Sequence, residues 1–251
     1  MQRIKNVLRP YYAPPKTALT AACDYYFKPA TRNPYGGPLN GQAHRQAMVK
    51  EIFQLVDFDL VIETGTFCGS STEWFATLFD GAIHTVELNP YYYYYARSRF
   101  LTHKNIHLHQ ANSVDYLTDL VRNRQLCLKN VFFYLDAHWN EYLPLREEIA
   151  IILENFDRCV IMIDDFQVDG DPGYGFDDYG PVGTLRMDYL SQSFHSDFAI
   201  FYPSLPSRLE TGKQRGSVVI TANSALQKTL KSAASLRYSG RSSERLADGA
   251  A

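Results

Sequence analysis

The segment 61–72, VIETGTFCGSST, constrains the fold of this chain more than any other part of the sequence. It begins in a short apolar run, passes two glycines and ends in polar residues that can open a helix. Glycine lets a backbone approach a ligand closely, and the free N–H groups of a first helical turn are hydrogen-bond donors. The pattern predicts a strand, a glycine turn and a helix start, with a packing-only role for the glycines as the alternative. The positions that we single out in this turn are Glu63, Gly65, Gly69, Ser70 and Ser71.

A second apolar strand is predicted at about 83–86, and it ends at Glu87. Two parallel strands joined by a right-handed crossover lie side by side, so Glu87 should reach a ligand held by the first turn. A carboxylate in that place suits the two hydroxyls of a ribose. The spacing differs from the dinucleotide fingerprint G-x-G-x-x-G, because positions 66–68 contain no glycine. This difference weakens the case for a pyrophosphate ligand.

Three aspartates and a histidine follow two further apolar strands. The run VFFYL leads to Asp136 and His138, and the run CVIMI leads to Asp164 and Asp165. Carboxylates gathered in one crevice repel one another, so we predict a hard divalent cation between them. His138 should point to the same side as Asp136, where it could take a hydroxyl proton. Each residue also has a purely structural alternative. Asp136 could cap the next helix, His138 could be a packing residue, and Asp164 with Asp165 could lie in a solvated turn.

Together these motifs resemble those of a known enzyme family. The pattern E-x-G-x-x-x-G followed by serines is similar to motif I of class I S-adenosylmethionine-dependent methyltransferases, with Glu87 at their ribose-binding position. The two strands that end in aspartates further resemble the metal-dependent macrocin O-methyltransferase (TylF-like) group, over roughly residues 41–220. This resemblance implies an α/β fold: a doubly wound Rossmann-like methyltransferase sheet, mostly parallel, with an antiparallel last strand.

The resemblance also implies a site. Mg2+ or another divalent cation would be held by Asp136, Asp164 and Asp165, and His138 would be the catalytic base. Asn112 and Ser113 follow a third short strand and would contact the adenine, although either could instead cap the next helix. The full set implied for S-adenosylmethionine is Glu63, Gly65, Gly69, Ser70, Ser71, Glu87, Asn112, Ser113 and Asp136.

We therefore expect methyl transfer from S-adenosylmethionine to a hydroxyl of a small molecule. A sugar of a secondary metabolite is the favoured acceptor through the resemblance alone. Two other classes stay open: a nicotinamide-dependent oxidoreductase on a similar sheet, and a non-catalytic binding protein that retains the methyltransferase fold.

Domain organisation follows from length and local composition. A chain of 251 residues with 45% hydrophobic residues can form one α/β domain with a substantial core. We place that domain at 41–222, with an acceptor-side loop at 166–185. The aromatic, turn-rich segment 1–40 is predicted to be an arm, acting as a lid or as a contact in a homo-oligomer. Residues 223–251 are predicted to be a C-terminal tail that is disordered at its end.

The composition also argues against several kinds of partner. A formal net charge of −2 and a pI near 6.4 give no electrostatic reason to expect nucleic acid or an anionic membrane. No apolar stretch approaches the ~18 residues of a membrane span. The four cysteines are widely spread and show no metal-ligand spacing. These features predict a cytoplasmic protein with reduced thiols.

Overall fold

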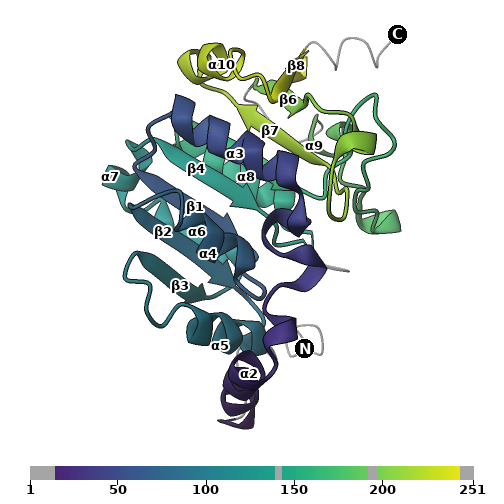
Figure 1. Cartoon of the computed structure of the whole chain (residues 1–251). Helices are drawn as coiled ribbons and strands as arrows, with labels where there is room; N and C mark the ends of the chain where they lie inside the picture. Colours follow the sequence, from purple (N-terminus) through teal and green to yellow (C-terminus); the bar gives the residue numbers. More distant parts are fainter. Residues whose placement is uncertain (1–14, 139–142, 192–196, 244–251) are drawn as a thin grey trace.

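The computed structural model describes residues 15–138, 143–191 and 197–243. Within these residues, eight strands form one sheet in the order β3-β2-β1-β4-β5-β7-β6-β8 (Figure 1). The strands are β1 (Leu60–Thr64), β2 (Ala82–Glu87), β3 (Ile106–Gln110), β4 (Val131–Leu135), β5 (Cys159–Asp164), β6 (Ala199–Pro203), β7 (Ser217–Thr221) and β8 (Leu236–Arg241). The first five strands are parallel to one another, whereas β7 pairs antiparallel with both β5 and β6. The predicted doubly wound, mostly parallel sheet is confirmed, including the antiparallel insertion near its end.

Helices cover both faces of this sheet. In Figure 1, α3 crosses in front of the sheet while α8 lies behind it. The helices are α2 (Pro15–Phe27), α3 (Ala43–Leu55), α4 (Ser70–Phe75), α5 (Pro90–Arg99), α6 (Ser113–Leu120), α7 (Arg124–Cys127), α8 (Leu145–Asn155), α9 (Met187–Ser191) and α10 (Ser224–Leu230). None of the helices in the described ranges is long and apolar enough to cross a bilayer.

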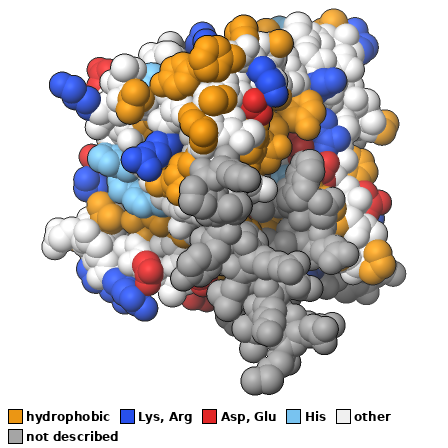
Figure 2. All heavy atoms as spheres, turned by 90° about the horizontal axis from the view of Figure 1, so that it is seen from below, with side chains coloured by type: hydrophobic (Ala, Val, Ile, Leu, Met, Phe, Trp, Pro, Cys, Tyr) orange, Lys and Arg blue, Asp and Glu red, His pale blue; other side chains and the backbone are white. Residues whose placement is uncertain are grey.

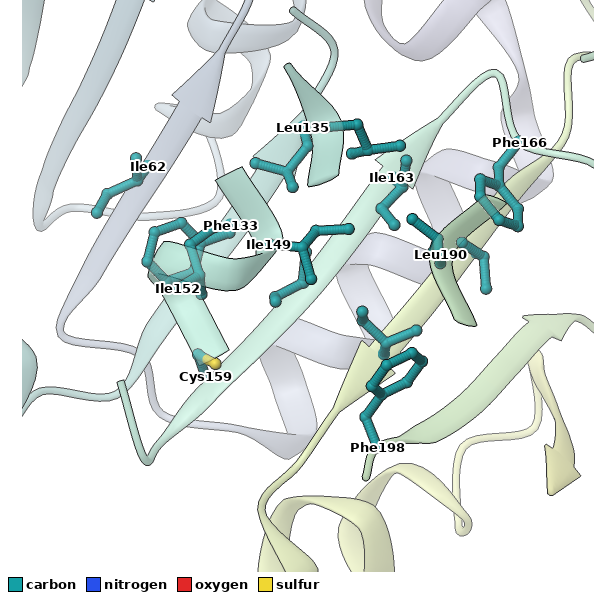
Figure 3. Close-up of a cluster of buried hydrophobic side chains, with 14 of the residues drawn as sticks. Ile62, Phe133, Leu135, Ile149, Ile152, Cys159, Ile163, Phe166, Leu190 and Phe198 are labelled. Atoms are coloured by element: carbon teal, nitrogen blue, oxygen red, sulfur yellow. The ribbon is translucent and has the colours of Figure 1, made fainter. Parts of the chain in front are cut away.

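Two hydrophobic cores result, one on each face of the sheet. Successive side chains of a strand point to opposite faces, so Phe133 of β4 packs with Ile149 and Ile152 of α8, whereas Phe132 packs on the opposite side with Val49 of α3. Figure 3 shows part of the α8 core, in which strand and helix side chains interdigitate. The five side chains named above, from β4, α8 and α3, are completely buried. Each such side chain contributes roughly 1.5–3 kcal/mol, which explains why the central strands are almost purely apolar.

The sheet continues past residue 222, where we expected the C-terminal tail to begin. Strand β8 pairs antiparallel with β6 and forms the last edge of the sheet. Its sequence LRYSGR is largely polar, and of its residues only Leu236 is buried, at 8% exposure, while the half-buried Tyr238 packs against the same core. Charged residues such as Arg237 suit an edge strand, since charge discourages pairing with another chain. Residues 244–251 lie outside the described residues.

The segment that precedes α3 docks against two other parts of the chain. Tyr35, Leu39 and Asn40 all have positive φ angles, of 56°, 51° and 61°, so this segment holds three residues in the sparsely populated left-handed region. Leu39 N donates to Ser71 Oγ at 3.1 Å, and the carbonyl of Asn40 accepts from Lys213 N at 3.1 Å. The expected arm therefore touches the glycine turn in its described part, while residues 1–14 lie outside it. Its role as a lid or an oligomer contact stays a prediction.

Candidate functional site

The glycine turn connects β1 to α4 at the carboxyl edge of the sheet. Gly65 has a φ of +86°, and a Cβ atom there would lie 2.2 Å from the carbonyl oxygen of Asp136. Gly69 has a φ of +74°, and its Cβ would lie 2.4 Å from the Phe100 ring. Close packing therefore requires glycine at both positions. One result of that packing is that the turn after β1 touches the turn after β4.

Glu63 is a buried residue of β1 that stabilises this turn through hydrogen bonds. Its side chain is 1% exposed, and its carboxylate accepts hydrogen bonds from the hydroxyls of Thr72 and Thr85, the latter at 2.6 Å. Burial raises the pKa of Glu63 to about 7. Because Thr72 belongs to α4 and Thr85 to β2, Glu63 ties both elements to β1. No local sequence signal marked either threonine as its partner.

Glu87 lies at the end of β2, as expected, and is 9% exposed. Its Oε2 accepts from Phe67 N at 2.8 Å and its Oε1 accepts from Asn89 N at 2.7 Å. One oxygen therefore faces the glycine turn and the other faces the loop that follows β2. Each carboxylate oxygen retains a second lone pair that could accept a hydroxyl. This arrangement fits a ligand that carries two adjacent hydroxyls.

The start of α6 contains a group of unpaired buried oxygens. Asn112 is the helix N-cap and accepts from Val114 N at 2.9 Å, which is the capping alternative. Ser113 Oγ, Thr64 Oγ1 and Glu148 Oε1 are all buried and have no hydrogen-bond partner within the described residues. Burial raises the pKa of Glu148 to about 7. The Ser113 and Thr64 hydroxyls lie close enough to Glu148 to offset part of this rise, so Ser113 faces an acid that is about half protonated near pH 7.

Asp164 is saturated by donors from the protein itself. Its Oδ1 forms an ion pair with Arg45 and accepts from Asp165 N at 2.8 Å. Its Oδ2 accepts from Tyr134 Oη at 2.5 Å and from Asn40 Nδ2 at 3.3 Å. The Arg45 and Asp164 side chains are each only 2% exposed. Arg45, from α3, is a charged site residue that sequence reasoning missed.

The structure instead brings Asp136, His138 and Asp165 together. One ligand atom from each of these residues lies within 4.8 Å of the other two. His138 Nε2 is 3.8 Å from Asp136 Oδ1, its side chain is 2% exposed, and Nε2 has no hydrogen-bond partner in the described part of the chain. Asp165 adopts a positive φ of 50° directly after β5. The three expected carboxylates therefore separate into two that face this point and one, Asp164, that faces Arg45.

The acceptor-side loop adds a further acid to this cluster. Asp177 Oδ2 lies 4.0 Å from His138 Nε2 and accepts from Tyr179 Oη at 2.5 Å. Arg215 forms ion pairs with both Asp177 and Asp165, with its Nε 2.7 Å from Asp165 Oδ1. The loop had been predicted to face the acceptor. Nothing in the sequence around Arg215 predicted its position between two acids.

The electrostatics of this cluster favour an added cation. Partial burial and the charges of Asp164 and Asp165 raise the pKa of Asp136 well above its usual range. Burial, followed by the charge of Asp164, raises the pKa of Asp165 to about 7 despite the neighbouring Arg215. A divalent cation reverses both effects because it stabilises the ionised carboxylates.

A second titratable cluster lies at the β2–β3 edge. The His84 ring stacks on that of His109, with centroids 5.3 Å apart, and contacts the tilted ring of His107 at 4.8 Å. His84 Nδ1 also lies 2.8 Å from Tyr116 Oη. Burial and then the neighbouring histidines lower the pKa of His84 to about 4. Histidine side chains gather at one place on the face in Figure 2. The His84 imidazole is therefore packed as a neutral ring near neutral pH.

Solved structures of methyltransferases share the fold of this chain. An O-methyltransferase from Bacillus cereus, in complex with SAH, has a TM-score of 0.52 and 17% identity, with 86% of this chain and 96% of that chain covered. A candidate caffeoyl-CoA O-methyltransferase from Staphylococcus aureus has a TM-score of 0.55 and 12% identity, covering 88% and 98%. A candidate O-methyltransferase from Klebsiella pneumoniae has a TM-score of 0.54 and 14% identity, covering 88% and 96%.

No family model and no curated protein matches the chain in sequence. The likeness at 12–17% identity concerns the fold, and it covers nearly the whole length of each of these structures. The chain has the α/β Rossmann-like fold of class I S-adenosylmethionine-dependent O-methyltransferases, with antiparallel strands at the C-terminal side of the sheet.

Proposed function

We propose that this protein is an S-adenosylmethionine-dependent O-methyltransferase that acts on a hydroxyl of a small molecule. One observation carries the proposal: Glu87 ends β2 while Asp136 and Asp165 follow β4 and β5, all at one edge of a methyltransferase sheet. Strand β1 lies between β2 and β4, so a nucleoside bound across the β1 turn would present its sulfonium to the acidic cluster.

Each part of the cofactor has a suitable partner in this arrangement. Glu87 would accept the two ribose hydroxyls. Ser71 accepts from Leu39 N and keeps its own O–H to donate to the carboxylate of the cofactor. The hydroxyl of Ser113, the first residue of α6, would bind the adenine edge. The complete proposed set remains Glu63, Gly65, Gly69, Ser70, Ser71, Glu87, Asn112, Ser113 and Asp136, in which Glu63 and the glycines act by shaping the turn.

A divalent cation fits part of the carboxylate set that the family resemblance implies. Asp136 and Asp165 face a common point, whereas both oxygens of Asp164 already have donors. When bound, the cation would lower the pKa of the acceptor hydroxyl and so favour its ionised form near neutral pH.

The methyl transfer itself needs few protein groups. The acceptor oxygen forms a bond to the methyl carbon while the carbon–sulfur bond breaks, and the electron pair stays on sulfur to give S-adenosylhomocysteine. The hydroxyl proton passes to a base in the cluster. His138 and Asp177 both face this point, since Nε2 of His138 lies 4.0 Å from Oδ2 of Asp177. The protein contributes mainly by positioning the two reactants in line.

The acceptor would enter beside the loop 166–185. Tyr179 and Asp177 stand next to His138 and could stack on and hydrogen-bond to a polar ring. A sugar of a secondary metabolite, and membership of the macrocin O-methyltransferase group, are proposals that rest on the sequence motifs alone.

Calorimetric titration with S-adenosylhomocysteine tests the proposal, with NADH as the competing ligand class. We expect S-adenosylhomocysteine to bind, and Glu87→Gln to weaken it by roughly tenfold to a hundredfold, because a hydrogen bond to a charged group is lost. Glu154→Gln, at an exposed site on α8, is the matched control and should bind as the wild type does. Binding of NADH alone would favour the oxidoreductase. Failure to bind either ligand would refute the enzyme proposal and favour the non-catalytic alternative.

A productive acceptor screen would follow from a positive titration. Transfer of a labelled methyl group to hydroxyl compounds, with and without a chelator, would separate a catalyst from a protein that only binds the nucleoside. No transfer to any sugar, diol or hydroxy acid would refute hydroxyl methylation while leaving cofactor binding intact.

A further inference from the structure

We propose that a divalent cation at this edge of the sheet is held by Asp136, His138 and Asp165, and that Asp164 stays outside its coordination shell. The meaning of this site rests on the proposed function, but the donor set follows from contacts in the structure. It differs from the three aspartates that the sequence motifs imply.

Asp164 has no capacity left for a cation. A carboxylate offers about four lone-pair positions. Asp164 uses its oxygens to accept from Arg45, Asp165 N, Tyr134 and Asn40. Because the Arg45 side chain is 2% exposed, moving Asp164 onto a cation would leave a buried guanidinium without its partner. Arg45 also donates to the carbonyl of Gly216 at 3.0 Å, so it cannot follow Asp164 without losing that bond.

His138 has the opposite property, because its buried nitrogen needs a partner. Its side chain is 2% exposed and Nε2 has no hydrogen-bond partner in the described residues. A buried polar atom without a partner is costly, and in native proteins such an atom is usually paired with a water or an ion. Nε2 lies 3.8 Å from Asp136 Oδ1, and one ligand atom each of Asp136, His138 and Asp165 lies within 4.8 Å of the other two. Two atoms that are each about 2.1 Å from one cation are at most about 4.2 Å apart, so the 3.8 Å pair can share a cation as it stands, and any wider pair in the cluster must close to that limit when the cation binds.

The donor set identifies the class of cation. Mg2+ prefers oxygen ligands and near-octahedral geometry, whereas imidazole suits first-row transition metals. One imidazole with two carboxylates therefore favours Mn2+, Fe2+, Co2+ or Zn2+ over the Mg2+ that three aspartates imply. We expect Mn2+ and Co2+ to bind at least about tenfold more tightly than Mg2+.

The same geometry narrows the choice of proton acceptor. A nitrogen that faces a cation is not free to take a proton. Asp177 Oδ2, 4.0 Å from His138 Nε2, is then the other acidic group of the acceptor-side loop that faces this point. The loop that shapes the acceptor pocket would thus also supply this group.

Electron spin-echo spectroscopy of the full chain loaded with Mn2+ alone tests the donor set without any turnover. A directly coordinated imidazole imprints nitrogen modulation on the Mn2+ echo, and we expect this modulation in the wild type. His138→Gln should abolish the modulation and weaken Mn2+ binding by roughly tenfold to a hundredfold. His84→Gln, which removes a histidine of the separate β2–β3 cluster, should retain the signal.

The aspartate variants separate the two donor sets. Asp165→Asn should weaken Mn2+ binding, whereas Asp164→Asn, checked for folding by circular dichroism, should keep the nitrogen modulation. Wild-type protein that binds Mn2+ without nitrogen modulation would overturn the inference, and this measurement does not depend on the folding of any variant. Absence of Mn2+ binding would also overturn it. The titration with S-adenosylhomocysteine is a separate measurement. The metal experiment can therefore fail without deciding whether the protein is a methyltransferase.

Discussion

Substitution of Arg45 is expected to destabilise the protein strongly, because Arg45 is the buried counter-charge of Asp164. Removing one partner of a buried ion pair costs about 3–5 kcal/mol. Arg45→Met would in addition remove the hydrogen bonds from Arg45 to the carbonyls of Arg215 and Gly216, and each of these contributes about 0.5–1.5 kcal/mol. The expected total is about 4–8 kcal/mol near pH 7. For a protein of this size that corresponds to a fall in melting temperature of about 8–32 °C.

Thermal and urea unfolding, followed by circular dichroism, would measure this loss. Arg97→Met is the control, because Arg97 is exposed on α5 and its loss should change stability by less than about 0.5 kcal/mol. The double substitution Arg45→Met with Asp164→Leu should be more stable than Arg45→Met alone, since it removes both buried charges. A loss below about 1 kcal/mol for Arg45→Met, or additive losses in the double variant, would refute the view of Asp164 as a paired structural group.

Three further substitutions test other parts of the site. Burial lifts the pKa of Glu148 from 4.5 to about 7, so its protonated form is the stable one in the fold and stability is lost as pH rises through this range. The wild-type free energy of unfolding should fall between about pH 5 and pH 8, and in Glu148→Gln this fall should be smaller by up to about 3 kcal/mol. An unchanged pH profile in the variant would contradict this. Gly65→Ala should abolish S-adenosylhomocysteine binding and lower the melting temperature, because its Cβ would collide with a carbonyl 2.2 Å away, whereas Gly170→Ala, with nothing within 4 Å, should cost only about 1–2 kcal/mol for its positive φ. Asp177→Asn should slow methyl transfer by roughly a hundredfold or more while Mn2+ binding is retained, and unaltered turnover would assign the proton to another group.

Much of the fold could be predicted because its central strands are buried on both sides. Strands β4 and β5 consist almost wholly of apolar residues and β1 begins with three of them, so each was visible as an apolar run followed by a polar residue. Strand β8 escaped prediction because it is an edge strand with one buried residue, and a polar edge has no periodicity that separates it from a tail.

The site was predictable as a list of residues but not as an arrangement. Apolar runs that end in acids indicated Asp136, Asp164 and Asp165, yet neighbours at a strand end can point in different directions. Which of the last two faces the cluster depends on Arg45, which is distant in sequence, and on the left-handed backbone of Asp165. The expectation that His138 is a base rather than a ligand stays untested. Long-range pairing of this kind leaves no local pattern in a single sequence.

The sheet order has a consequence for synthesis on the ribosome. Strand β5 pairs with β7 on one side, and β7 is made only after β6 and the acceptor-side loop. A nascent chain that has emerged only through β5 therefore exposes an apolar edge with unpaired backbone groups. Such an edge is prone to join another chain. Chains released early would be expected to aggregate, so completion of β7 protects the growing protein before any ligand can bind.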